Sequence, residues 1–186
     1  MQITLFGGTF DPPHLGHSSI AAALLKKGLA DEVWFVPVGE HAFEKKFSPA
    51  QHRLAMLELI LEPQQKIEQY ELEQSGMSIT YETLKALSKK YPEHTFSFVI
   101  GSDNLARFHE WHDFTEMLAE FKFFVYPREG FALEPLYQGM QVIEGVEPVN
   151  ISSTEVRKRI QTMGSITELV KPAVAQYIQA QQLYVL

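Results

Sequence analysis

The chain has 186 residues, 45% of them hydrophobic, with no cysteine and a formal net charge of −7 at pH 7. This length predicts a single domain over residues 1–186 with a substantial core, and the lack of cysteine excludes disulfides and thiolate metal sites. No run is long enough to span a membrane and no secretory pattern is visible, so we expect a cytoplasmic protein that binds no membrane and, given its charge, no nucleic acid.

Apolar or aromatic runs alternate with helical patterns along the chain. In chain order we expect a strand at 3–6, a helix at 18–27, a strand at 33–36, a helix at 49–61, a weaker strand at 67–72, a helix at 83–90, strands at 96–100 and 121–126, and helices at 153–162 and 172–181. Pro49 behind Ser48 is typical of a first helical residue behind its N-cap. Residues 129–149 carry prolines and glycines and indicate an irregular connection. This alternation predicts an α/β protein: a single Rossmann-like domain with a parallel sheet flanked by helices and a C-terminal helical segment.

The turn between the first strand and the first helix is the most informative stretch. It reads Gly7-Gly8-Thr9-Phe10-Asp11-Pro12-Pro13-His14-Leu15-Gly16-His17. It matches neither the dinucleotide fingerprint Gly-x-Gly-x-x-Gly nor the P-loop, but a glycine turn before a helix N-terminus is a site for anions. At i, i+3 the His14 and His17 rings face the same side. Cationic side chains are disfavoured at a helix N-terminus unless an anion is present. We therefore interpret both as phosphate donors rather than helix caps, and a metal site is the weaker alternative because no third ligand is spaced suitably.

A second motif opens the expected helix at 153–162, and it reads Ile151-Ser152-Ser153-Thr154-Glu155-Val156-Arg157. Ser152 and Glu155 form a capping box, which is sufficient to explain both. It does not explain Arg157, whose side chain leans toward the helix start against the macrodipole. The motif therefore predicts a second phosphate cradle. A further candidate is Gly101-Ser102-Asp103, at the carboxyl end of a strand, where ligands bind in parallel sheets.

Together the two motifs resemble the nucleotidyltransferase α/β phosphodiesterase superfamily, and within it the bacterial nicotinate mononucleotide adenylyltransferases. The resemblance covers nearly the whole chain, and its other parts are Ser78-Ile79-Thr80-Tyr81-Glu82-Thr83-Leu84, Gly101-Ser102-Asp103-Asn104-Leu105 with Phe108 and Trp111, and the closing Tyr177-Ile178 and Leu183-Tyr184. It implies that the 5′-phosphate of a pyridine mononucleotide attacks the α-phosphorus of ATP, with Mg²⁺ assisting, and that pyrophosphate leaves. No protein nucleophile is needed for this chemistry, which depends on positioning and charge stabilisation.

The resemblance also implies roles for individual residues. His14, His17 and Arg157, with Ser152 and Ser153, would hold the ATP phosphates; Gly8, Thr9 and Phe10 would lie along the nucleotide; Gly101 and Asp103 would meet ribose; Thr80 would lie near the mononucleotide; and Trp111 would stack on the pyridine ring. A tryptophan is more often a core residue, but the polar neighbours of Trp111 favour stacking.

The chain departs from the family after the second strand, where Pro-Pro-His-Lys is common. Here Lys45 or Lys46 would supply the phosphate lysine and His41 would contribute, the alternative being a solvated basic pair. His52 and Arg53 are further candidate phosphate contacts. Two other functions stay open: an adenylyl- or cytidylyltransferase acting on another phosphate ester such as phosphopantetheine, and a non-catalytic nucleotide-binding protein.

Overall fold

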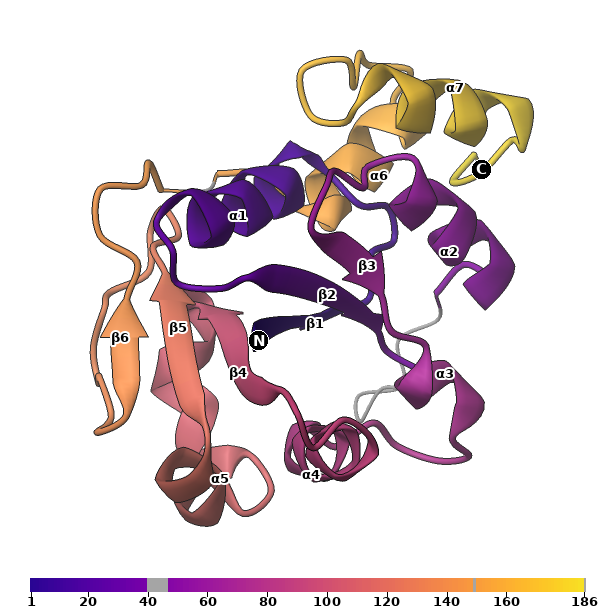
Figure 1. Cartoon of the computed structure of the whole chain (residues 1–186). Coiled ribbons are helices and arrows are strands. Elements are labelled where there is room, and N and C mark those ends of the chain that lie inside the picture. Colours follow the sequence, from indigo (N-terminus) through magenta and orange to yellow (C-terminus); the bar gives the residue numbers. More distant parts are fainter. Residues whose placement is uncertain (40–46, 149, 186) are drawn as a thin grey trace.

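A six-stranded parallel sheet forms the centre of the molecule, in the strand order β3-β2-β1-β4-β5-β6 (Figure 1). The structure is a computed structural model that describes residues 1–39, 47–148 and 150–185. The strands are β1 (Gln2–Gly8), β2 (Glu32–Pro37), β3 (Gln65–Ile67), β4 (Thr95–Gly101), β5 (Lys122–Tyr126) and β6 (Met140–Val142). This is the order of the doubly wound Rossmann fold. The predicted fold class, a Rossmann-like parallel sheet flanked by helices, is confirmed.

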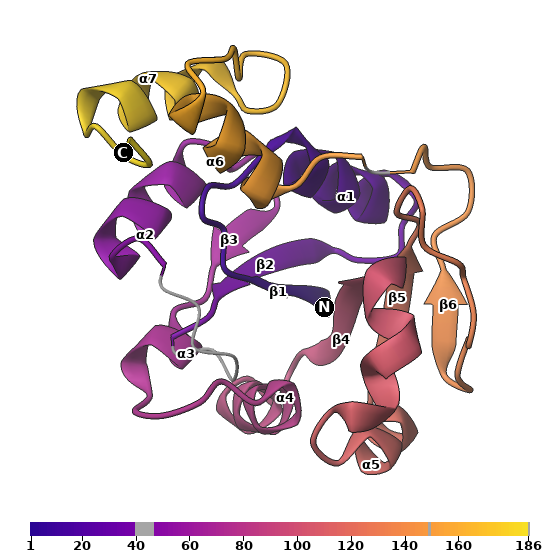
Figure 2. The same ribbon diagram turned by 180° about the vertical axis from the view of Figure 1, so that it is seen from behind.

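Helices cover both faces of this sheet. They are α1 (Leu15–Lys26), α2 (Ala50–Glu58), α3 (Tyr70–Glu73), α4 (Thr80–Lys90), the 3₁₀ helix η1 (Ser102–Glu110), α5 (Phe114–Glu120), α6 (Ser153–Gln161) and α7 (Pro172–Ala180). Figures 1 and 2 show α1, α2, α6 and α7 on one side of the sheet and α4 and α5 on the other. None of the described helices is long and apolar enough to cross a membrane.

Alternation along the strands builds a separate core on each face, because successive strand side chains point to opposite sides. Phe6 and Phe35 face the first core, which α1, α2, α6 and α7 complete. Leu5 and Trp34, their neighbours in sequence, face the second core with α4, η1 and α5. Both faces are buried, so the strands read as continuous apolar runs, the pattern that the sequence analysis detected.

The strand expected at 67–72 is wrong in its position. β3 occupies Gln65–Ile67 and pairs with β2, and the chain then turns into the short helix α3. After β3, the backbone N–H of Glu68 still bonds Phe35, while its carboxylate accepts the N–H of Tyr70 at 3.1 Å. This side-chain acceptor diverts the backbone from the sheet into a helical turn.

Part of the connection expected at 129–149 is also regular. Met140–Val142 adds β6 to the edge of the sheet, paired with Phe123–Val125 of β5. The strand has three residues and follows Gly139, which has a φ of +91°. So short an edge strand has almost no periodicity of its own, and its pairing with β5 defines it.

Several helix boundaries differ from expectation. α1 begins at Leu15 and α4 at Thr80, each earlier than predicted, and η1 and α5 were not predicted. α2 has Pro49, not Ser48, as its N-cap, with an extended ψ of 142°. The backbone N–H of Ser48 bonds the Asp11 carboxylate at 3.1 Å, so Ser48 belongs to the loop that joins α2 to the glycine turn.

Candidate active site

The glycine turn after β1 meets the end of β4 at the point where the strand order reverses. β1 and β4 are neighbours, yet the chain leaves β1 toward β2 on the opposite side. In such sheets ligands bind at the carboxyl ends of the strands beside this switch point. The crowding there is severe at Gly101, where a Cβ atom would lie 2.2 Å from Oδ1 of Asp103 and 2.8 Å from Cδ of Arg128. Only glycine lets η1 and Arg128 approach this closely.

His14 and His17 stack at the start of α1 with both rings on one side, as predicted, and they also form the helix cap that the prediction set aside. His14 is the N-cap, His17 is one turn on, and their ring centroids are 3.7 Å apart with an interplanar angle of 24°. The backbone N–H of His14 donates to Nδ1 of His17 at 3.0 Å. Since Nδ1 accepts, the proton of a neutral His17 ring lies on Nε2. Within the described residues, Nδ1 of His14 is buried with no hydrogen-bond partner, a property that it shares with Nδ1 of His94.

Both imidazoles are neutral at physiological pH. Burial lowers the pKa of His14 from 6.5 to about 3, with a smaller contribution from the charge of Arg128. Burial also lowers the pKa of His17, and the electrostatic effects of His14 and Arg128 lower it further. Two neutral rings side by side do not repel each other, and each retains an N–H that it can donate to an anion.

We expect the protein to lose stability as the pH falls below 6.5. The unfolded chain then binds protons at these histidines while the folded chain does not, so the free energy of unfolding decreases with falling pH until about pH 3. The slope for a fully buried histidine is about 1.4 kcal/mol per pH unit. Urea denaturation of wild type and His14→Gln at pH 7, 6 and 5 measures it. Equal slopes in the two proteins would contradict this assignment.

The Phe10 ring is buried and packs against the His17 ring. Its side chain is 1% exposed and its ring centroid lies 4.9 Å from that of His17 and 5.5 Å from that of Phe35. A φ of +50° turns its side chain into the core. Only the backbone of Phe10 is therefore available to a nucleotide, together with Gly8 and Thr9. A Cβ on Gly8 would lie 3.1 Å from the Phe10 ring.

The second motif docks onto the first. Nη1 of Arg157 donates to the backbone carbonyl of Asp11 at 2.6 Å, and Oγ of Ser153 donates to that of Pro12 at 2.9 Å. Nη2 of Arg157 bonds Oγ1 of Thr154 at 3.2 Å, so the guanidinium does lean toward the start of α6. The two helix N-termini thus meet at one turn, and their first N–H groups have no partner inside either helix.

Ser152 caps α6 as predicted, since its Oγ accepts the backbone N–H of Glu155 at 3.2 Å. The carboxylate of Glu155 makes a 2.8 Å ion pair with Arg159, one turn further on. The cap explains Ser152 structurally. Ser152 would therefore act on a nucleotide only indirectly, by capping the helix whose N-terminus faces the site.

The expectation that Arg53 contacts phosphate is wrong in this structure, whereas a phosphate contact of His52 remains a prediction. Arg53 is 3% exposed, and its guanidinium donates to the carbonyls of Ser48 and Thr9 at 3.1 and 3.0 Å. Nδ1 of His52 bonds the Tyr177 hydroxyl at 2.9 Å. Both side chains hold α2 in place. His41, Lys45 and Lys46 lie outside the described residues.

Arg128 is the site residue that the sequence analysis missed. It makes a 3.0 Å ion pair with Asp103, and its charge reaches both histidines. Asp103 follows Gly101 by two positions, Arg128 follows Tyr126 by two, and these strand ends are register partners. The sequence feature that could have indicated Arg128 is its position just after the strand expected at 121–126, at the carboxyl end where ligands bind. With Arg157 it supplies the local positive charge that a phosphate site in an acidic protein requires.

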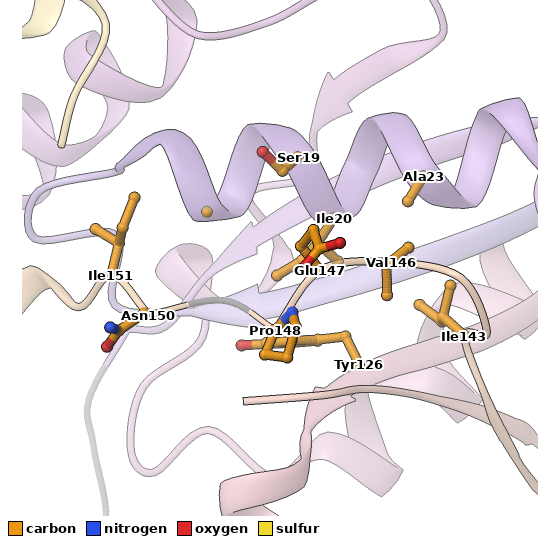
Figure 3. A pocket seen from close by; sticks show the side chains of 11 residues that line it. Ser19, Ile20, Ala23, Tyr126, Ile143, Val146, Glu147, Pro148, Asn150 and Ile151 are labelled. Atoms are coloured by element: carbon orange, nitrogen blue, oxygen red, sulfur yellow. The ribbon is translucent and has the colours of Figure 1, made fainter. Parts of the chain in front are cut away.

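A cavity of about 310 Å³ lies next to α1 (Figure 3). One wall is α1, and the others are the end of β5 and the segment before α6. Its lining residues are Gly16, Ser19, Ile20, Ala23, Tyr126, Ile143, Val146, Glu147, Pro148, Asn150 and Ile151. The walls are largely apolar, with polar groups at Asn150 and Glu147, which suits a flat heterocycle.

Trp111 and Thr80 lie on elements that cover the other face of the sheet. Trp111 follows η1, is partly exposed, and packs on Phe108 with ring centroids 4.9 Å apart. Thr80 begins α4, whose approach is tied to the end of β2 by a 3.2 Å hydrogen bond from the N–H of Gly39 to Ser78. The stacking role of Trp111 and the substrate contact of Thr80 remain predictions.

Comparison with known proteins agrees with this geometry. Residues 5–159 match the cytidylyltransferase-like family. The chain is 36% identical to a probable nicotinate-nucleotide adenylyltransferase of Oceanobacillus iheyensis, covering 98% of this chain and 96% of that protein. It is 33% identical to the nicotinate-nucleotide adenylyltransferase of Bacillus subtilis, covering 98% of both chains.

Solved structures give the same result. The nicotinic acid mononucleotide adenylyltransferase of Plasmodium falciparum in complex with NaAD superimposes with a TM-score of 0.82 at 26% sequence identity, over 98% of this chain and 97% of that one. The fold and the relatives agree, and the chain belongs to the nicotinate-nucleotide adenylyltransferases of the cytidylyltransferase-like family.

Proposed function

We propose that this protein transfers the adenylyl group of ATP to the 5′-phosphate of nicotinate mononucleotide, which releases pyrophosphate and forms the dinucleotide of NAD biosynthesis. The observation that carries the proposal is the neutral, stacked histidine pair at the N-terminus of α1, with the N-terminus of α6 docked onto the same turn. The names of the relatives favour nicotinate mononucleotide over phosphopantetheine as acceptor.

The donors suit a reaction without a protein nucleophile. As charge builds on the phosphoryl oxygens, the Nε2–H of His17, the Arg157 guanidinium and backbone N–H groups at the two helix starts can donate to them. The N–H groups of Leu15 and Glu155 are not among these donors, because they already bond Leu169 and Ser152. His14 and His17 would hold the ATP phosphates, and Ser153 would keep α6 at the right distance. These groups are positioned by backbone and core contacts before substrate arrives, so little reorganisation is needed.

The cavity in Figure 3 fits the adenine of ATP. It is contiguous with the start of α1, its walls are largely apolar, and its volume is in the range of small-ligand sites. The Asp103–Arg128 pair at the carboxyl ends of β4 and β5 lies at the expected place for the ribose hydroxyls. Trp111 and Thr80 would then receive the pyridine mononucleotide from the other face of the sheet.

Mg²⁺ belongs to the proposal as a companion of the ATP triphosphate, where it would neutralise phosphoryl charge. In the described part of the chain, no group of three or more His, Asp or Glu side chains could hold a metal ion alone. The Asp11 carboxylate already accepts hydrogen bonds on both oxygens, from Tyr184 and Ser48. The residues therefore fit a Mg²⁺ held by phosphate oxygens and water, which is its usual coordination in nucleotide sites.

A direct assay tests the proposal. The purified protein is incubated with ATP, Mg²⁺ and either nicotinate mononucleotide, nicotinamide mononucleotide or phosphopantetheine, and pyrophosphate release is followed together with the product mass. We expect the dinucleotide from nicotinate mononucleotide. Adenylylation of phosphopantetheine with neither pyridine mononucleotide accepted would overturn the substrate, and nucleotide binding without any turnover would indicate the non-catalytic alternative.

We expect Arg157→Lys to lower kcat/KM for ATP about tenfold. The change keeps the positive charge but loses the planar fork that bonds Asp11 and Thr154 together, and one hydrogen bond to a charged group corresponds to about that factor. Arg159→Lys on the same helix is the matched control, because Arg159 pairs with Glu155 outside the site. Equal kinetics for the two variants would show that Arg157 is an ordinary helix residue.

A further inference from the structure

The C-terminal segment of the chain is tied into the glycine turn. In Figures 1 and 2 it follows α7 and ends beside α2. The hydroxyl of Tyr184 donates to Oδ1 of Asp11 at 2.6 Å, across 173 positions of sequence. Asp11 is buried and lies inside the motif that carries the histidine pair. The end of the chain therefore contacts the interior of the phosphate-binding turn.

Asp11 is held at three atoms. Its Oδ1 accepts from Tyr184, its Oδ2 from the backbone N–H of Ser48 at 3.1 Å, and its backbone carbonyl from Arg157 at 2.6 Å. A carboxylate fixed on both oxygens leaves its own peptide little freedom to rotate. The peptide that receives Arg157 is thus oriented by a bond from the C-terminal segment.

Arg53 reinforces the same turn but leaves the carboxylate orientation to Tyr184 and Ser48. Its guanidinium bonds the carbonyls of Thr9, in the glycine turn, and of Ser48, whose N–H bonds the Asp11 carboxylate. Burial raises the pKa of the Tyr184 hydroxyl, and the hydrogen-bonded Asp11 carboxylate raises it further. The hydroxyl is therefore a permanent donor in the working pH range, and the contact acts as a constant constraint rather than a switch.

We propose that Tyr184 is a positioning residue for adenylyl transfer: through Asp11 it holds the turn that presents Arg157 and the histidine pair to the ATP phosphates. The inference rests on the proposed function and extends it to a residue that touches no substrate. By this inference the C-terminal segment affects the binding and reaction of ATP. The mononucleotide half, on the other face of the sheet, should be insensitive to it.

The test compares two tyrosine hydroxyls of the same C-terminal region. Tyr184→Phe removes the bond to Asp11, and the matched control Tyr177→Phe removes the bond to His52. Both should lower Tm, so kinetics are measured well below both transitions. We expect Tyr184→Phe to reduce kcat/KM for ATP about tenfold, because small misplacements of positioned groups are costly. The KM for the mononucleotide should stay within about twofold, and Tyr177→Phe should change neither constant.

A double-mutant cycle checks that Tyr184 acts through Asp11. In the Asp11→Ala background, Tyr184→Phe should cost less than about twofold, because the group it positions is gone. A full tenfold loss in that background would overturn the proposed route. Should Asp11→Ala fail to fold, the split between the ATP and mononucleotide constants in Tyr184→Phe decides alone.

Failure of the inference can be separated from failure of the function. An active wild type with equal kinetics in Tyr184→Phe and Tyr177→Phe overturns the positioning role and leaves adenylyl transfer intact. An inactive wild type overturns the function, and the positioning role is then measured by titration with a non-hydrolysable ATP analogue. Weaker binding to Tyr184→Phe alone supports the role, and equal binding to both variants overturns it.

Discussion

We expect His17→Ala to lose about 10²–10³-fold in kcat while the protein stays folded, the usual cost of removing one preorganised donor to a transition state. The reason lies in the tautomer. Because Nδ1 of His17 accepts the backbone N–H of His14, its proton is on Nε2, which is free to donate to phosphate. His14→Ala should also reduce kcat, with more of its effect on the KM for ATP. Steady-state kinetics with both substrates varied measure these effects.

The matched control for both variants is His94→Ala. His94 is also largely buried and packs among Trp34, Tyr91 and Phe96. It precedes β4 at the amino end of the strand, whereas the site lies at the carboxyl ends. It should lower Tm without changing kcat. A kcat for His17→Ala within a few-fold of wild type, or a loss as large in His94→Ala, would remove His17 from the chemistry.

The second large effect is expected at Trp111. Trp111→Ala should raise the KM for the mononucleotide about 5–150-fold and leave the KM for ATP nearly unchanged, since stacking of a base on an aromatic ring contributes about 1–3 kcal/mol. Phe108 backs the indole at 4.9 Å, so the ring is supported on one side and partly exposed. A nicotinate ring should be preferred over nicotinamide where two or more N–H donors meet its carboxylate, because charge-assisted hydrogen bonds are stronger.

Two variants control for a merely structural tryptophan. Trp111→Phe keeps an aromatic face and should recover most of the lost mononucleotide affinity. Trp34→Phe changes the other tryptophan, which is buried in β2 against Tyr91, and should affect stability alone. Parallel increases in the KM values for ATP and mononucleotide in Trp111→Ala would show that the indole supports the fold of the site rather than the pyridine ring.

The departures from expectation share one cause. Long buried strands such as β1 and β4 carry enough apolar residues to be found locally, whereas β6 is defined by pairing with β5 and α3 by a side-chain bond to Glu68. The role of Arg53 likewise could not be predicted from its neighbours in sequence. In sequence it is a basic residue on a helix near a phosphate motif, and in the structure it is buried against backbone carbonyls.

Local sequence patterns predicted the strand, turn and helix that open the chain, the placement of the His14 and His17 rings on one side, and the lean of Arg157 toward the start of α6. These features depend on helix geometry and on neighbours within a few positions, so local residues suffice. Three long-range contacts were visible in the fold alone: Arg157 docks on Asp11, Arg128 pairs with Asp103, and Tyr184 reaches the glycine turn. Each of these contacts joins segments that are brought together by the parallel crossovers and by the packing of α6 and α7 on one face of the sheet. No local periodicity encodes such pairings, because the partners are far apart in sequence and meet only when distant elements pack together.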